Sequence, residues 1–89
     1  MRREIKVLPG TVRVENIDLI EFMKDLSEIL KNVPELEGVR ANGVNLVSPR
    51  GNVSMSWVTK EAFNMTGSNP EILEKLIEAM KKYYQIKAQ

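Results

Sequence analysis

The stretch from Ile17 to about Val33 repeats its apolar residues at helical spacing, and this pattern most constrains the fold. At about 100° per residue the apolar side chains fall within an arc of roughly 120°, the width of one core-facing stripe. They are Leu19, Phe22, Met23, Leu26, Ile29, Leu30 and Val33. Asn16 is the expected N-cap, and Pro34 ends the helix. A helix that buries one side needs a second layer to cover it.

The first strands of that layer are expected from Ile5 to Val14. Two alternating runs flank Pro9-Gly10, which is the signal of a hairpin turn. The predicted cross-strand pairs are Ile5 with Val14, Val7 with Val12, and Lys6 with Arg13. Glu4 and Glu15 lie diagonal to the two basic residues and can neutralise them.

A second set of strands is expected in the middle of the chain. Asn42-Gly43 joins the extended runs 38–41 and 44–47, and a third strand from Val53 to about Thr59 follows a four-residue loop, 49–52. This loop length pairs Leu46 with Met55 and Val44 with Trp57. All these strands then share one apolar face, made of Val39, Ala41, Val44, Leu46, Val53, Met55 and Trp57.

The opposite face of these strands is mainly polar, so helices should cover only one side of the sheet. Its members are Arg40, Asn45, Ser54 and Ser56, with Val47 and Val58. The segment 60–67 is expected to be an irregular connection whose Phe63 and Met65 tuck against the core.

The last helix is predicted from about Pro70 to about Tyr84. It starts either with a capping box of Ser68 and Glu71, or with Asn69 as cap and Pro70 in the first position. Its apolar residues spread over roughly 180°, which is wider than a surface helix needs. Either the core with Phe63 and Met65 covers the excess, or a partner does so through an interface made of Leu73, Ile77, Met80 and Tyr84.

A chain of 89 residues has room for one core, and a composition of 43% hydrophobic and 28% charged residues is that of an ordinary globular protein. We therefore expect residues 1–89 to form a single α+β domain. Its architecture is expected to be a two-layer sandwich, with a largely antiparallel sheet and two helices on one face. The predicted order is ββαβββα.

The composition argues against catalysis. The absence of cysteine and histidine removes thiolate nucleophiles, the commonest metal ligands and the commonest general base. No serine stands in a Ser-x-x-Lys spacing either. We therefore expect no catalytic residues, no cofactor and no metal. With no apolar run of membrane-spanning length, we also expect a cytoplasmic protein that does not bind a membrane.

Two functional hypotheses follow. The first is a non-enzymatic interaction or accessory module that works through protein–protein contacts, as a homodimer or inside a larger assembly. The alternative is nucleic-acid binding by a local basic patch, because the net charge of +1 supplies no global attraction. The patch would use the N-terminal hairpin, the Arg50 hairpin tip and the polar sheet face, through Arg3, Lys6, Arg13, Arg40 and Arg50.

Overall fold

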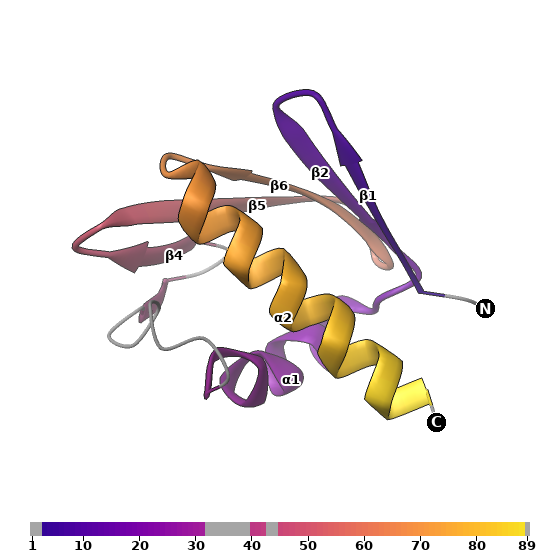
Figure 1. Cartoon of the computed structure of the whole chain (residues 1–89). Coiled ribbons are helices and arrows are strands. Elements are labelled where there is room, and N and C mark those ends of the chain that lie inside the picture. Colours follow the sequence, from indigo (N-terminus) through magenta and orange to yellow (C-terminus); the bar gives the residue numbers. More distant parts are fainter. Residues whose placement is uncertain (1–2, 32–39, 43–44, 89) are drawn as a thin grey trace.

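A computed structural model describes residues 3–31, 40–42 and 45–88, and within them a six-stranded antiparallel sheet carries two helices on one face (Figure 1). In chain order the elements are β1 (Glu4–Leu8), β2 (Thr11–Glu15), α1 (Leu19–Lys31), β3 (Arg40–Asn42), β4 (Asn45–Ser48), β5 (Gly51–Thr59), β6 (Ala62–Gly67) and α2 (Pro70–Ala88). The strands lie side by side in the order β1-β2-β6-β5-β4-β3. The α+β class and the antiparallel sheet with two helices are confirmed.

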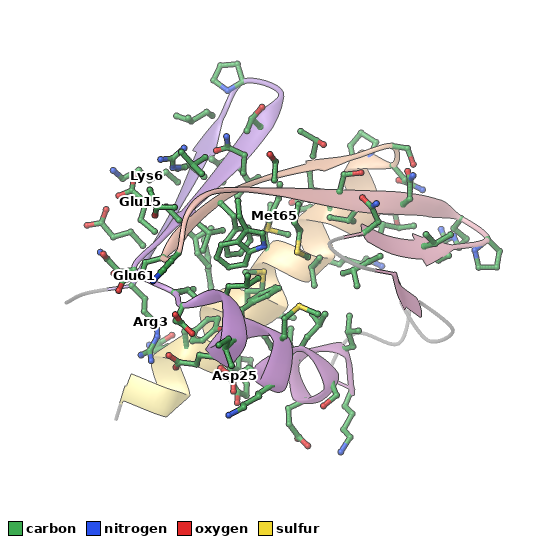
Figure 2. The ribbon with its side chains drawn as sticks, turned by 180° about the vertical axis from the view of Figure 1, so that it is seen from behind. Arg3, Lys6, Glu15, Asp25, Glu61 and Met65 are labelled. Atoms are coloured by element: carbon green, nitrogen blue, oxygen red, sulfur yellow. The ribbon has the colours of Figure 1, made fainter. Side chains whose placement is uncertain are left out.

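Strand β6 corrects the predicted order, because the segment expected to be irregular is an inner strand of the sheet. It pairs with β2 on one side and with β5 on the other. A turn in which Glu61 donates its backbone N–H to Thr59 Oγ1 (3.2 Å) reverses the chain just before it. The prediction that Phe63 and Met65 reach the core is confirmed, since both are buried, and Met65 lies on the helix side of the sheet (Figure 2).

The N-terminal hairpin has the predicted register. Ile5 pairs with Val14, Lys6 with Arg13, and Val7 with Val12. The expected neutralisation also occurs, because the Lys6 ammonium lies 3.4 Å from the Glu4 carboxylate and 3.5 Å from that of Glu15. The hydrogen bond to Glu4 and the charge of Glu15 raise the pKa of Lys6 above its ordinary value.

The register of the middle strands differs from the prediction by two residues. Leu46 pairs with Val53, not with Met55, because the loop before β5 contains only Pro49 and Arg50. Ser48 closes this short turn, since its hydroxyl donates to the Gly51 carbonyl (2.8 Å) and accepts from the backbone N–H of Arg50 (3.3 Å). Strand side chains alternate with a period of two, so this shift leaves them on the predicted faces.

The turn between β3 and β4 also differs from the prediction. Asn42, which the sequence placed in the turn, belongs to β3 and pairs with Asn45. Gly43 and Val44, the predicted partner of Trp57, lie outside the described residues, as do Val33 and Val39.

Helix α1 begins two residues later than expected, and Asp18 caps it in place of Asn16. The Asp18 carboxylate accepts the backbone N–H groups of Ile20 (3.0 Å) and Glu21 (3.2 Å). Asn16 instead adopts a left-handed conformation with φ of 63°, which asparagine tolerates better than most residues. Ile17 precedes the helix and donates its N–H to the carbonyl of Glu61 (3.1 Å), which fixes the entry to α1.

Helix α2 starts by the second of the two predicted arrangements. Asn69 accepts the N–H of Glu71 through its side-chain oxygen (3.0 Å), and Pro70 is the first helical residue. Ser68 has another role, because its hydroxyl accepts the N–H of Asn52 (2.9 Å) and so joins the start of α2 to β5.

The core lies between the sheet and the helices and centres on three aromatic rings. Phe63 packs against Trp57 with 4.2 Å between ring centroids and against Phe22 with 5.0 Å. Val14 of β2 and Leu76 of α2 are fully buried around this group. The rings therefore join β5, β6 and α1 in one cluster.

Gly51 is the position where we expect a small substitution to be most damaging. An alanine Cβ there meets Ser68 Oγ at 2.9 Å and Asn69 Cβ at 3.0 Å, on a backbone with φ of +147°. Strain and overpacking together should lower the free energy of unfolding by about 2–4 kcal/mol, measured by urea unfolding. Gly10→Ala is the matched control, because φ there is +74° but nothing lies within 4 Å. Its loss should be about 1–2 kcal/mol, and equal losses would contradict the account.

Candidate interaction groove

The four residues of the predicted α2 interface do not form a surface patch. Met80 is 0% exposed and Tyr84 5%, and both belong to the core of a single chain. Ile77 is also buried, whereas Leu73 is partly buried against the core. Strand β6, with Phe63 and Met65, supplies part of the surface that covers the wide apolar face of α2.

Three of the five basic residues of the nucleic-acid hypothesis already contact acidic side chains. Arg3 forms an ion pair with Glu21 (2.6 Å) and lies over the ring of Tyr84. Lys6 lies between two carboxylates, and Figure 2 shows it beside Glu15. Arg13 donates to the side-chain oxygen of Asn64 (3.2 Å) and lies 3.5 Å from Glu15.

The other two basic residues, Arg40 and Arg50, lie in the part of the sheet formed by β3, β4 and β5. Arg50 is exposed at the β4–β5 turn, as the sequence predicted. The side chain of Arg40 lies outside the described residues. Strand β6 lies between the charged hairpin and β5, so the structure separates Arg50 from the hairpin.

A groove with a volume of about 570 Å³ lies between the β1–β2 hairpin and α2. We call it the hairpin groove. Its hairpin wall is made of Val7, Leu8, Gly10, Thr11 and Val12. Val12 is buried, but Val7, its partner across the ladder, is 64% exposed. The end of the hairpin stands away from α2 (Figure 1), and Val7 near this end is largely exposed.

The helix wall of the groove is made of six residues of α2: Pro70, Leu73, Glu74, Ile77, Glu78 and Lys81. Leu73 and Ile77 are the apolar members, so two residues of the predicted interface do line this groove. They line the groove together with Val7, which is on the same face of the hairpin as the buried Val12. The wide apolar face of the last helix is the sequence feature that indicated this wall of the groove.

The charged residues of the groove stand at its rim. Glu74, Glu78 and Lys81 are exposed, and none of them forms an ion pair with another residue that the structure describes. Glu71, one turn before, is paired with Lys75 at 3.6 Å. The groove therefore has an aliphatic interior and two exposed carboxylates one helical turn apart, neither paired with a described residue.

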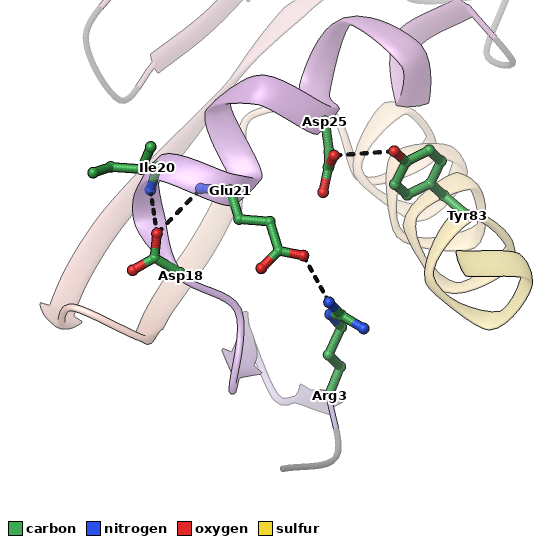
Figure 3. A network of polar contacts seen from close by, with 6 residues as sticks. All are labelled: Arg3, Asp18, Ile20, Glu21, Asp25 and Tyr83. Carbon is green, nitrogen blue, oxygen red and sulfur yellow. Dashed lines mark hydrogen bonds and ion pairs between the residues drawn. The ribbon is translucent and has the colours of Figure 1, made fainter. Parts of the chain in front are cut away.

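A polar cluster holds the opposite end of the helix layer together (Figure 3). The hydroxyl of Tyr83 donates to the buried Asp25 carboxylate (3.0 Å), and Arg3 reaches Glu21 from the N-terminal segment. The neighbouring Tyr84 hydroxyl is buried and has no hydrogen-bond partner among the described residues. Burial raises the pKa of Tyr84, and the negative charges of Asp25 and Glu21 raise it further.

We expect Tyr84→Phe to leave the free energy of unfolding unchanged or to raise it by up to about 1 kcal/mol, because it removes a buried hydroxyl without a partner. Tyr83→Phe is the matched control and should cost about 1.5–3 kcal/mol, since it removes a donor to a carboxylate. Urea unfolding at pH 7 measures both. Equal losses in the two variants would contradict this assignment.

The same tyrosine gives a pH dependence with a defined sign. Its pKa is raised in the folded chain, so the unfolded chain releases the phenolic proton first as pH rises above about 10. The contribution of Tyr84 to the free energy of unfolding is therefore complete below about pH 10 and is lost as the pH rises above that value. The decline between pH 9 and 11 should therefore be shallower in Tyr84→Phe than in the wild type.

Neither a metal centre nor a membrane span is found in the part of the chain that the structure describes. No group of three or more carboxylate, histidine or cysteine side chains there is placed to hold a metal ion. No helix of that part is long and apolar enough to cross a bilayer. Comparisons with models of protein families, with curated proteins and with solved structures find no match to this chain.

Proposed function

We propose that this chain is a non-enzymatic protein-interaction module whose hairpin groove receives a segment of a partner polypeptide. The observation that carries the proposal is the exposure of Val7. This side chain faces the helix layer beside the buried Val12, yet 64% of it is open to solvent. An apolar side chain on the core side of a sheet is normally covered, so a partner that covers it gains hydrophobic free energy.

The shape and chemistry of the groove favour a polypeptide over a small molecule as its ligand. Small-molecule sites use a few polar groups that converge on the ligand inside an apolar pocket. Here the interior is formed by aliphatic residues such as Leu73 and Ile77, while the charged groups lie on the rim. An apolar centre with a polar rim is typical of protein–protein interfaces.

Two expectations from the sequence have weaker support. A homodimer built on Leu73, Ile77, Met80 and Tyr84 would need Met80 and Tyr84 to leave the core. Nucleic-acid binding would need basic side chains free to neutralise phosphates, but Arg3, Lys6 and Arg13 already contact carboxylates. We therefore propose the groove, and not these surfaces, as the site of interaction.

A peptide-display selection on the wild-type chain tests the proposal. We expect selected peptides to bind with micromolar affinity and to lose at least about tenfold in affinity to Val7→Asp, because the new carboxylate must be desolvated on binding. Fluorescence anisotropy with each purified variant gives the dissociation constants.

Val58→Asp is the matched control. Val58 is 54% exposed and lies on the sheet strand β5, away from the residues that line the groove. It should leave peptide affinity unchanged. Failure to select any binder, or binders that are equally sensitive to both substitutions, would overturn the proposal.

A further inference from the structure

We infer that the segment bound in the hairpin groove is an amphipathic helix with two basic residues one turn apart. This inference rests on the proposed function and specifies the chemistry of the partner.

The helix wall of the groove has the surface pattern that receives another helix. Its residues form two parallel rows, each with a spacing of four: Leu73, Ile77 and Lys81 in one, and Pro70, Glu74 and Glu78 in the other. Rows with this spacing are the ridges of a helix surface, and helices pack by inserting the ridges of one into the grooves of the other. The furrow between these two rows is open to the hairpin groove.

The length of the groove also suits a helix. The lining residues of α2 extend from Pro70 to Lys81, which at 1.5 Å per residue corresponds to about three turns, or roughly 17 Å. A helix laid beside α2 over this length would cover Val7. It would add a third member to the helix layer, beneath the part of the hairpin that α2 leaves open.

The rim determines the charge of the partner. Glu74 and Glu78 are exposed, lie one turn apart and have no ion-pair partner within the described part of the chain. Lysine or arginine at positions i and i+4 of the bound helix would have the same spacing as these carboxylates. Lys81, one turn further along α2, favours an acidic or neutral residue at the following turn of the partner.

An extended partner strand is less favoured, although β1 lies at the edge of the sheet. Lys6 stands in the middle of this edge strand, where it contacts Glu4 and Glu15, and Pro9 follows its end. Lysine and proline on edge strands discourage the addition of further strands. The groove beside α2 therefore offers apolar contact to a helix more readily than backbone pairing to a strand.

Four synthetic peptides of about 16 residues test the inference, a length at which a helix can form in isolation. The first has leucines at i, i+3, i+4 and i+7 and two flanking lysines four residues apart. In the second, glutamates replace the lysines; in the third, a central proline interrupts the first sequence. The fourth has the same composition as the first, but its leucines stand at every second position, an alternation that favours a strand.

The lysine helix should bind about tenfold more tightly than its glutamate counterpart, which is the effect of two exposed ion pairs. The double variant Glu74→Lys/Glu78→Lys should reverse this preference. The control Glu61→Lys/Glu71→Lys changes net charge by the same amount at exposed positions that do not line the groove, and should preserve it.

The outcomes separate this inference from the proposed function. If the alternating or proline-containing peptide binds as well as the lysine helix, or the charge preference survives the reversal, the inference is wrong. The proposed function then still stands if the display selection yields binders that Val7→Asp weakens. If that selection yields none, both are wrong.

Discussion

The structure depends on the burial of β6 between β2 and β5. Its Phe63 and Met65 are fully buried and pack beneath the sheet against the helices. The turn before it also holds the entry to α1, because the carbonyls of Lys60 and Glu61 accept the N–H groups of Leu19 and Ile17. One strand thus joins the N-terminal hairpin, the later strands and the first helix.

The position of β6 explains why the hairpin tip is not covered by α2. Helix α2 packs against β6, so it covers β2 at Val12 but leaves Val7, one strand further out, exposed. At the other end of the helix layer, Arg3–Glu21 and Asp25–Tyr83 contacts join the N-terminal segment, α1 and α2. The hairpin is therefore secured near its base while its tip stands away from α2, and the hairpin groove lies between them.

Local patterns in the sequence predicted most of these elements but not their long-range arrangement. The register of the N-terminal hairpin depends on neighbouring residues and is confirmed, and the Asn69 cap is one of the two predicted starts of α2. Strand β6 was missed because only Phe63 and Met65 alternate with polar residues in a short segment, and its partner β2 is distant in sequence. The sequence pointed to one wall of the groove, through Leu73 and Ile77. It could not show that Val7 is exposed on the other wall, because this depends on where α2 crosses the sheet.

The most direct test of the groove as the binding surface is a methyl NMR titration of the chain with a peptide obtained by display selection. If the hairpin groove is the binding surface, the largest shift changes will fall on the methyl groups of its lining residues Val7, Val12, Leu73 and Ile77. Val47 and Val58, which are exposed outside the groove, should change little. Changes concentrated at Val47 and Val58, with the groove methyl groups unaffected, would contradict the groove as the binding surface.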